Sequence, residues 1–515
     1  MAEHDVILQM NKICKAFDGN QALDNINFEL GSREIMGLLG GNGAGKTTLM
    51  NVLYGLYRQD SGEILLKGKK ISISSPGDAI NHGIGMVHQH FLQINNFPVI
   101  QNIILGTPVK ERFTMNLTAE KKKVSELCDR FAIKVDLDAD VGQLPMGTRQ
   151  KVEILKALYR GIDILILDEP TTNLTPQEVD ALFQTLRVMV TEGLSIVFIT
   201  HKLREVLSVA DRITLLRNGK NVSTISRGEA SEEDLVWGMV GEDMDVKTSI
   251  IFSKEQRFAT QIDLGITPVL DVENINLVNE QGITRLKDVT FKVYPGEIFG
   301  VAGVAGNGQS ELAESLVGIQ QLSSGKVRFN GQEHPMVTAE LLEKGLTYIP
   351  EDRLEDGYLP KVNVAQNLIL GAQHKQPYSK NGVIDWKKVF ATSWELIKEY
   401  NIKTNGPQDT AANLSGGNIQ RVMIARAFAH AGETLIVAHC PTRGLDIPSM
   451  DFVYKKMLER KGQNLSTLLI SEDLDELLLL CDRIGVMYRG EMVGTLSRGQ
   501  FDKYEIGRMM SGVHG

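Results

Sequence analysis

A glycine-rich stretch that ends in a lysine and a threonine has the residue types needed to bind nucleotide phosphates. It reads Gly40-Gly41-Asn42-Gly43-Ala44-Gly45-Lys46-Thr47 and matches the spacing G-x-x-x-x-G-K-[ST] in full. The glycines allow backbone N–H groups to converge on phosphate oxygens. Lys46 can reach the β- and γ-phosphates, and the Thr47 hydroxyl suits Mg²⁺. The stretch therefore predicts a phosphate loop.

The segments around this loop support the prediction. The apolar run 35–39 before it reads as a buried strand, and 48–53 after it opens a helix. The N-terminus of that helix would face the phosphates. A glycine-rich turn that matched by chance would lack this strand–loop–helix context.

Two carboxylates follow a second apolar strand. The run 164–167 leads directly into Asp168 and Glu169. Asp168 suits the surroundings of Mg²⁺, and Glu169 suits polarising an attacking water. An acidic pair at a strand end is by itself often structural, so its weight here comes from the phosphate loop upstream.

The chain contains an internal duplication. Residues 22–28 return as 285–291, and Gly40 returns as Gly303, an offset of 303 − 40 = 263. Leu144 returns as Leu414, an offset of 414 − 144 = 270, so we expect seven extra residues in the second copy, around 373–385. A repeat this long indicates two whole domains of one fold.

We expect a first domain at 1–245, a linker at 246–266 and a second domain at 267–515. Helical patterns such as 119–131 and 386–400 alternate with apolar strands such as 195–199. This order predicts an α/β fold with a parallel sheet and ligands at the carboxyl ends of its strands.

Composition narrows the class of protein. The chain has 515 residues, is 42% hydrophobic, and carries a net charge of −9, which argues against a general nucleic-acid binder. It has no run of 18 apolar residues, no signal-peptide pattern, and four cysteines without metal-ligand spacing. We expect a soluble cytoplasmic protein with free thiols.

Taken together, these motifs resemble those of the ATP-binding cassette (ABC) ATPases, and the resemblance covers nearly the whole chain twice. It implies two tandem domains, each with a parallel-sheet core bearing the phosphate loop, an antiparallel β subdomain and a helical subdomain. It also implies that the two domains form a head-to-tail pseudo-dimer with ATP and Mg²⁺ as cofactors.

The resemblance assigns further roles in the first domain. Gln89 matches the glutamine that senses the γ-phosphate, His201 the switch histidine, and Phe17 the aromatic residue on which adenine stacks. The catalytic residues are then Glu169, His201, Gln89 and Lys46, and the metal-binding residues Thr47, Gln89 and Asp168. The nucleotide-binding residues of this domain are Phe17, Gly40, Gly41, Asn42, Gly43, Ala44, Gly45, Lys46, Thr47 and Thr48.

The family signature Leu-Ser-Gly-Gly-x-x-Gln differs between the copies. In the first copy Pro145 replaces the serine, and Thr175 replaces a later aspartate. In the second copy 414–420 is intact, and the resemblance assigns Ser415, Gly416, Gly417 and Asp446 to ATP binding.

The second copy has lost the other parts. Gln309 replaces the phosphate-loop lysine, His439 and Cys440 replace both carboxylates, and glutamates replace Gln89, His201 and Phe17. Acids around a polyphosphate are electrostatically unfavourable. We expect His439 and Cys440 to be plain replacements rather than a metal site. With Pro145, the degenerate site comprises Gly303, Gly308, Gln309, Ser310, Glu351, His439, Cys440 and Glu472.

In this family each nucleotide lies between the phosphate loop of one domain and the signature of the other. All intact parts then fall in one composite site, and all damaged parts in the other. We expect one hydrolytic site per chain, with the second site binding nucleotide weakly or statically.

Within the family, the chain is most similar to importer ATPases for simple sugars and nucleosides, on the motifs 75–80, 349–353 and 441–446. The motif 83–91 resembles nucleoside-import ATPases most. This implies two integral membrane permease subunits, with a coupling helix docking near 91–106, an extracytoplasmic solute-binding protein, and a peripheral location at the cytoplasmic membrane face. We expect no nucleic-acid partner and no obligatory homodimer.

Other functions are considered as well. Ribose, galactose or riboflavin remain alternative cargoes. A ribosome-associated tandem ABC translation factor would have a long charged linker, and a DNA-repair ABC ATPase would have zinc-binding cysteine clusters.

Overall fold

The computed structural model describes residues 5–89, 91–107, 116–241, 248–253, 262–333, 337–429 and 434–512. His90 and the stretches 246–247 and 254–261 of the expected linker lie outside the described residues. The chain forms two compact units, Met1–Val246 and Lys247–Gly515, here called domain 1 and domain 2. No helix among the described residues has the length and apolar character needed to cross a membrane.

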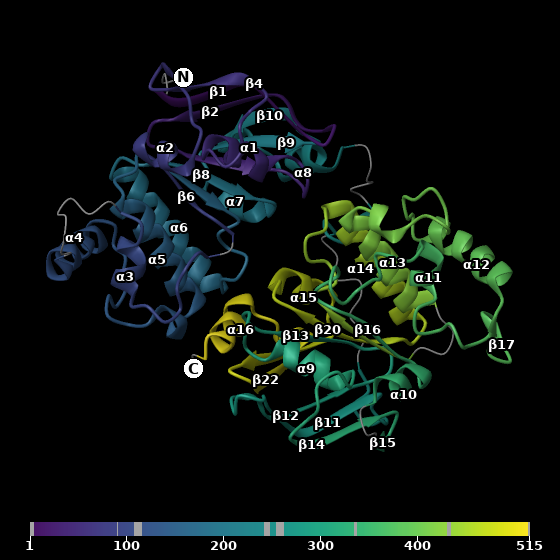
Figure 1. The fold of residues 1–515 in the computed structure, drawn as a ribbon. Coiled ribbons are helices and arrows are strands. Elements are labelled where there is room, and N and C mark those ends of the chain that lie inside the picture. The colour runs from purple at the N-terminus through teal and green to yellow at the C-terminus, as the bar shows by residue number, and fades with distance from the viewer. Residues whose placement is uncertain are drawn as a thin grey trace. The chain divides into compact units, whose positions relative to one another are not determined.

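Domain 1 begins with an antiparallel sheet of strand order β2-β1-β4-β5. Apolar side chains alternate along its strands, so that Leu8, Met10, Phe28 and Leu30 are buried while Gln9 and Glu29 between them are not. Figure 1 shows this sheet at the edge of the domain that also carries the N-terminus. Its strands are β1 (Val6–Phe17), β2 (Asn20–Gly31), β4 (Ser61–Leu66) and β5 (Lys69–Ile71).

The central sheet of domain 1 has the order β10-β9-β3-β8-β7-β6, and only β10 runs antiparallel to its neighbour. Both of its faces are covered. Ile164 and Ile166 of β7 belong to the cluster with the antiparallel sheet, and Leu165 and Leu167 to the cluster with the helices. The strands are β3 (Ile35–Leu39), β6 (Ile84–Val87), β7 (Ile164–Asp168), β8 (Ser195–Thr200), β9 (Arg212–Arg217) and β10 (Lys220–Ser226). The strands expected at 35–39, 164–167 and 195–199 are confirmed.

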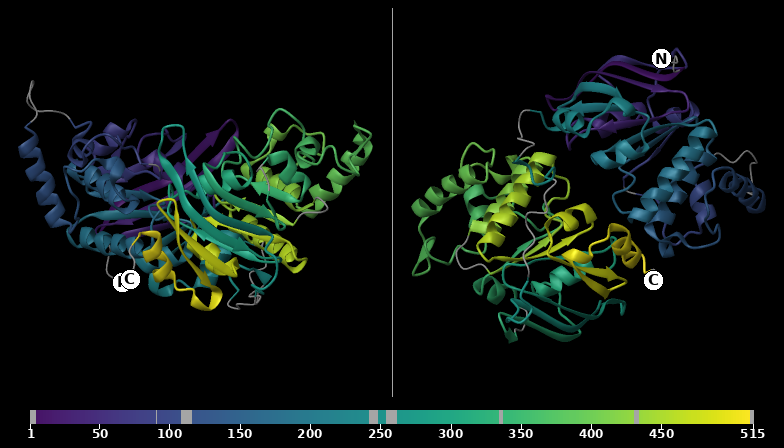
Figure 2. Two further views of the ribbon diagram at one scale, coloured as in Figure 1. Left: turned by 90° about the horizontal axis from the view of Figure 1, so that it is seen from below. Right: turned by 180° about the vertical axis from the view of Figure 1, so that it is seen from behind.

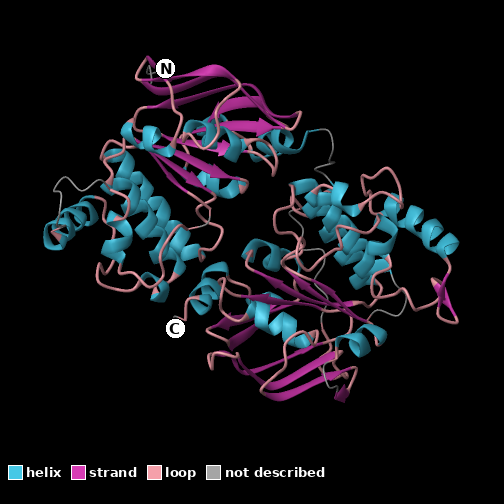
Figure 3. Ribbon diagram, viewed as in Figure 1, coloured by secondary structure: helices cyan, strands magenta, loops and turns pink. Residues whose placement is uncertain are grey.

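The helices of domain 1 include a lobe of three, α3 to α5, at the end of the central sheet. Figures 1 to 3 show this lobe on the side opposite the antiparallel sheet. The expected helix at 119–131 is confirmed as α4. The helices are α1 (Lys46–Leu53), α2 (Pro76–Asn81), α3 (Val99–Ile104), α4 (Leu117–Arg130), α5 (Met146–Tyr159), α6 (Pro176–Thr191), α7 (Leu203–Val209) and α8 (Glu232–Val240).

Domain 2 repeats both sheets in the same order, as β12-β11-β14-β15 and β22-β21-β13-β20-β19-β16. A small hairpin, β17–β18, is added. The strands are β11 (Leu270–Val278), β12 (Thr284–Val293), β13 (Ile298–Ala302), β14 (Ser324–Phe329), β15 (Gln332–Glu333), β16 (Leu346–Ile349), β17 (Ser379–Lys380), β18 (Val383–Ile384), β19 (Leu435–His439), β20 (Ser466–Ser471), β21 (Arg483–Tyr488) and β22 (Glu491–Ser497).

The helices of domain 2 repeat those of domain 1, and the expected helix at 386–400 is confirmed as α12. They are α9 (Gln309–Leu316), α10 (Thr338–Glu343), α11 (Val364–Leu368), α12 (Trp386–Glu399), α13 (Gly416–Ala429), α14 (Ile447–Gly462), α15 (Leu474–Leu480) and α16 (Lys503–Met510). The parallel core, antiparallel β subdomain and helical subdomain expected for each copy are therefore present.

The extra residues of the second copy are not all at 373–385, so that part of the expectation is wrong. The offset is 346 − 84 = 262 from β6 to β16, 364 − 99 = 265 from α3 to α11, and 386 − 117 = 269 from α4 to α12. Three residues (265 − 262) enter in the loop after β16, and four (269 − 265) enter between α11 and α12, where the β17–β18 hairpin lies. The offset also falls by one (263 − 262) before β16 and rises by one (270 − 269) between the start of α12 and Leu414. Spacing between motifs reveals only the total difference in length.

Residues 248–253, within the range expected as a linker, pack on domain 2. The buried Ser249 donates its hydroxyl to Asp451 Oδ1 of α14 at 2.8 Å, and the Ile250 amide donates to the same atom at 2.6 Å. The side chains of Ile250 and Ile251 contact the core of this domain. This part of the chain is therefore anchored rather than loose.

Candidate functional site

The phosphate loop of domain 1 lies between β3 and α1, as expected. Gly43 and Gly45 have φ angles of 77° and 99°, in the left-handed region that favours glycine. The Lys46 side chain is buried and donates to the carbonyl oxygens of Gly40 and Gly41 at 2.8 and 2.9 Å. Burial lowers the pKa of Lys46, while the charges of nearby carboxylates oppose this shift. The loop thus holds its cation inside the turn.

Thr47 and Asp168 offer oxygen atoms to a metal ion. The Thr47 hydroxyl donates to Asp168 Oδ1 at 3.4 Å. Burial raises the pKa of Asp168 to about 6, the charge of Glu169 adds to the rise, and Thr47 and Lys46 oppose it. A hydroxyl and a partly desolvated carboxylate are hard oxygen donors, which Mg²⁺ prefers. A bound dication would also compensate the buried charge, so these residues fit Mg²⁺.

Glu169 is contacted by His201 and Gln89, the two residues expected to contact the γ-phosphate. His201 Nδ1 lies 2.9 Å from Glu169 Oε1, and Gln89 donates to Oε2 at 3.4 Å. Burial alone would raise the pKa of Glu169, but the hydrogen bond and charge of His201 and the charge of Lys46 lower it overall. These two contacts fix the orientation of the Glu169 carboxylate.

The predicted catalytic and metal-binding residues come together at one edge of the central sheet. Gln89, Glu169 and His201 follow β6, β7 and β8, which are neighbours in the sheet, and β3 leads into the phosphate loop beside them. Carboxyl ends of parallel strands meet at the same edge, where ligands bind in such folds. The arrangement can bind a nucleoside triphosphate and activate a water molecule.

Phe17 lies at the end of β1 with an exposed ring, as adenine stacking requires. Its ring meets Tyr57 edge-on, with centroids 5.1 Å apart and planes at 73°. The side chain is 39% exposed. Sequence reasoning missed Tyr57, because a tyrosine in the turn after α1 belongs to no motif.

A protein-family model described as ABC transporter matches the chain twice, over residues 23–172 and 286–437. The chain belongs to the ABC transporter family. Each match contains one phosphate loop; the first also contains the end of β7, and the second stops within β19. The protein is thus an ABC ATPase with two ATPase domains in one chain.

Relatives of nearly the same length support this assignment. The chain is 39% identical to the nucleoside import ATP-binding protein NupA of Lactococcus lactis subsp. cremoris, over 99% of both chains. It is 39% identical to the guanosine import ATP-binding protein NupO of Bacillus subtilis, over 99% of this chain and 98% of that one. It is 38% identical to the glucose import ATP-binding protein TsgD13 of Haloferax volcanii, over 98% and 96%.

The ABC signature turns of the two domains share a backbone conformation but differ in chemistry. Leu144 has φ −82° and ψ 144°, and Leu414 has φ −76° and ψ 140°. Pro145 then supplies neither a hydroxyl nor an N–H. In contrast, Ser415 is exposed, and its hydroxyl accepts a hydrogen bond from the side-chain Nδ2 of Asn418 at 2.8 Å.

Asp446 and Thr175 have a structural role that sequence reasoning missed. Asp446 caps α14 by accepting from the Ser449 amide at 2.9 Å, and Thr175 caps α6 in a reciprocal arrangement with Glu178. The spacing of threonine and glutamate three residues apart is the signal that could have revealed the cap.

The phosphate loop of domain 2 keeps its shape without the lysine. Gly306 and Gly308 have φ angles of 86° and 101°. The Gln309 side chain is buried against Gly303, where an added Cβ atom would lie 2.6 Å from Nε2. The Gln309 Oε1 atom has no hydrogen-bond partner among the described residues.

Glu351 is the centre of the degenerate site of domain 2. It forms an ion pair with Arg443, accepts from the Ser310 hydroxyl at 3.4 Å, and lies 3.5 Å from His439 Nε2. Sequence reasoning gave Arg443 no role at this site, because no motif spacing links it to Glu351. This domain neutralises its added acid with its own arginine.

Glu351, His439 and Cys440 lie close enough together to surround a metal ion. However, the Arg443 guanidinium already contacts the carboxylate. Burial raises the pKa of the Cys440 thiol well above its ordinary value and lowers that of His439. A thiol that burial keeps neutral is a poor ligand, because metal ions bind the thiolate. Our expectation of plain replacements here stays a prediction. Burial likewise raises the pKa of Glu472.

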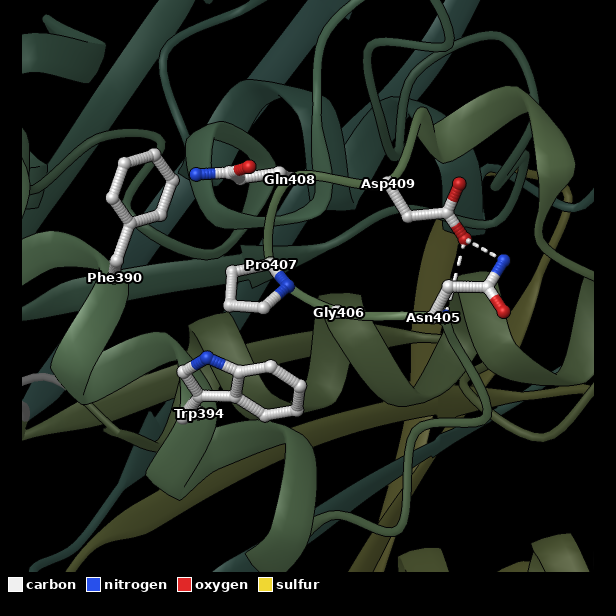
Figure 4. Close-up of a pocket in the computed structure, with 7 residues that line it drawn as sticks. All are labelled: Phe390, Trp394, Asn405, Gly406, Pro407, Gln408 and Asp409. Carbon is white, nitrogen blue, oxygen red and sulfur yellow. Dashed lines mark hydrogen bonds between the residues drawn. The ribbon is translucent and has the colours of Figure 1, made fainter.

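A separate surface pocket in the helical lobe of domain 2 contains none of the predicted site residues. Phe390 and Trp394 of α12 face the turn 405–409 across it (Figure 4). In domain 1, an ion pair between Lys121 and Asp138 joins the same two segments.

Proposed function

We propose that this ABC ATPase is the ATP-hydrolysing subunit of a nucleoside importer. Two membrane permease subunits would hold it at the cytoplasmic face of the membrane, and an extracytoplasmic solute-binding protein would deliver the cargo. The nucleoside and guanosine import relatives, each 39% identical over the full length, support this cargo. The carrying observation for ATP hydrolysis is the contact of Glu169 with His201 and Gln89.

A sugar importer is the second candidate. The glucose import relative is 38% identical, only one percentage point below the nucleoside relatives. Cargo does not contact an ATPase subunit, so such a small difference in identity carries little weight. Ribose, galactose and riboflavin are further cargoes to test.

In the proposed mechanism, Lys46 and the backbone N–H groups of its loop hold the β- and γ-phosphates of ATP. Thr47, Asp168 and Gln89 would hold Mg²⁺, which supplies positive charge that stabilises the transferred phosphoryl group. Glu169 orients water and takes up its proton, while His201 keeps the carboxylate in place. Phe17 stacks on the adenine ring.

We further propose that the intact signature completes this site. Ser415, Gly416, Gly417 and Asp446 of domain 2 would contact the nucleotide held by domain 1, in the head-to-tail arrangement that the family resemblance implies. Gln309, His439 and Cys440 lack the charges that hydrolysis needs, so the chain would have one hydrolytic site. ATP would then favour a closed state, and hydrolysis an open one.

The segment after Gln89 is the proposed docking region for a permease helix. Leu92, Phe97 and Leu105 are exposed apolar side chains there, with 67%, 37% and 42% of their surface accessible. Exposed apolar clusters of this kind often mark protein–protein contacts.

Uptake measurements test the proposal. Cells that produce the protein would be compared with cells carrying Glu169→Gln, using labelled nucleosides, ribose, galactose and riboflavin. The matched control is Cys440→Ala, at the equivalent position of domain 2. Loss of nucleoside uptake in Glu169→Gln alone supports the proposal, whereas loss of another solute changes the cargo. Unchanged uptake of every solute would contradict the importer, and ribosome binding would be tested next.

A further inference from the structure

Arg353 of domain 2 packs against two glycines, the signature residue Gly416 and Gly444 of the turn before α14. A Cβ atom added to Gly416 would lie 3.3 Å from Arg353 Nη2, and one added to Gly444 would lie 3.2 Å from the same atom. Gly416 begins α13 directly after Ser415, and Gly444 belongs to the turn that ends at the helix cap Asp446. The guanidinium therefore contacts both segments that carry the signature-side residues.

Several contacts hold this guanidinium in place. Arg353 Nη1 donates to the backbone carbonyl of Arg443 at 3.0 Å, and the Arg443 side chain pairs with Glu351. Glu351 in turn accepts from Ser310 at the start of α9. A continuous set of contacts thus runs from the phosphate-loop helix of domain 2 to its signature turn, made entirely of residues of this domain.

The loop that carries Arg353 is itself ordered. Asp352 Oδ1 accepts from the backbone amides of Leu354 and Glu355 at 2.8 and 3.0 Å. The Asp356 amide donates to the carbonyl of Asp352 at 3.0 Å. Arg353 therefore projects from a closed turn, so little conformational freedom is lost when its guanidinium packs on the glycines.

Domain 1 lacks this arrangement. Met146 stands at the position of Gly416 (416 − 270 = 146), and Asn173 at that of Gly444 (444 − 271 = 173). Side chains thus replace both glycines on which Arg353 packs. Thr172 stands at the position of Arg443 (443 − 271 = 172) and donates to the Glu169 carbonyl at 3.1 Å. The arginine packing occurs in the domain that has the intact signature.

We propose that Arg353 is a positioning residue for ATP hydrolysis, because it holds the signature turn and the turn before α14 in one fixed relation. This rests on the proposed function, in which Ser415 and Asp446 complete the nucleotide site. In this proposal the degenerate site of domain 2 has a structural role. Its Glu351 holds Arg443, and the backbone carbonyl of Arg443 in turn holds Arg353. A planar guanidinium covers two neighbouring glycines in a way that a lysine ammonium does not.

Steady-state ATPase kinetics of the full chain test this role. We expect Arg353→Ala to lower kcat about tenfold while the KM for Mg·ATP changes less than about twofold, because small misplacement of contacting groups slows chemistry more than binding. Arg353→Lys should recover only part of the loss. The control Arg328→Ala removes an arginine of the same domain that pairs with Glu273 at the surface, and should leave kcat unchanged.

A second variant keeps the test valid if Arg353→Ala does not fold. Glu351→Gln leaves Arg353 in the chain but weakens the ion pair that holds Arg443, and should lower kcat about threefold with KM unchanged. A wild-type kcat in the folded Arg353→Ala variant, or a rise in KM alone, would overturn the inference.

Glu169→Gln separates this outcome from failure of the proposed function. If Glu169→Gln abolishes turnover and Arg353→Ala does not reduce it, only the inference fails. If Glu169→Gln leaves turnover intact, the proposed function fails, and the inference fails with it.

Discussion

The two phosphate loops have nearly the same backbone and opposite side-chain chemistry. Gly45 and Gly308, which precede α1 and α9, have φ angles of 99° and 101°. The next residue is a buried lysine in domain 1 and a buried glutamine in domain 2. The loop shape therefore depends on its glycines and on the strand and helix beside it rather than on the lysine. A site can lose its charge without losing its fold.

The two sites also differ in how the charges of their carboxylates are compensated. Domain 1 gathers Asp168 and Glu169 around a space suited to a metal ion and phosphates, with Lys46 as the nearby cation. Domain 2 pairs its carboxylate Glu351 with its own Arg443. The first site is arranged for an external ligand, whereas the second has its charges balanced internally. In our proposal, the duplicated chain keeps one site for chemistry and uses the other as structure.

Replacing Lys46 and Gln309, which follow Gly45 and Gly308, tests this difference most strongly. We expect Lys46→Ala to lower kcat for ATP hydrolysis by about 10³-fold, because the β- and γ-phosphates lose their main cation. The matched Gln309→Ala variant should stay within about twofold of wild type. A steady-state ATPase assay measures both, and equal losses in the two variants would contradict the asymmetry.

The signature residues allow a second test. Ser415→Arg should lower kcat about 10²-fold, because a long side chain displaces the amides that would face the γ-phosphate. Pro145→Ser restores the family residue in domain 1 and should leave kcat within about twofold, since Gln309, His439 and Cys440 still lack the catalytic charges. Gain of activity in Pro145→Ser would show that the second site hydrolyses ATP.

A fully buried glutamate of domain 2 should make the stability of that domain depend on pH. Burial raises the pKa of Glu476 to about 7, from 4.5 in the unfolded chain, against hydrogen bonds from Ser471 and Thr442. The folded state then binds its proton more tightly, so this stability is present below pH 4.5 and is lost as pH rises through 7. Glu476→Gln should therefore raise the free energy of unfolding by about 2 kcal/mol at pH 8 and change it little at pH 4.5.

Glu205 of domain 1 provides the control, because 476 − 271 = 205 and Lys202 lies 3.8 Å from its carboxylate. Thermal unfolding at pH 4.5 and pH 8 measures both variants. A pH-independent effect of Glu476→Gln would contradict the prediction, as would an equal pH-dependent gain in Glu205→Gln.

The smallest expected effect concerns the binding of the adenine ring of ATP. Phe17→Ala should raise the KM for ATP about five- to tenfold with kcat nearly unchanged, because a stacked base contributes about 1 to 3 kcal/mol. Glu280 occupies the equivalent place in domain 2, and Glu280→Ala should leave KM as it is. A fall in kcat with no change in KM would contradict a role in adenine binding.

Much of the fold and of the first site could be predicted because each motif is short and continuous in the chain. The run 35–39 is apolar throughout, and it forms β3 over those same residues. Asp168 and Glu169 come together with Gln89 and His201 because all of them follow neighbouring parallel strands. The packing of 248–253 on domain 2 was not predicted, because the mixed and polar composition around it is typical of a linker. Only the structure shows the hydrogen bond from Ser249 to Asp451.

The amino-acid sequence by itself determined the two-domain α/β plan and identified the domain that carries the phosphate-binding and acidic residues, because these depend on residue types at fixed local spacing. Only the tertiary structure decided that Arg443 pairs with Glu351, that Arg353 packs on Gly416 and Gly444, and that Tyr57 meets Phe17. These partners are far apart in the chain or belong to no motif. Their contacts depend on how strands and helices pack, which no local pattern records.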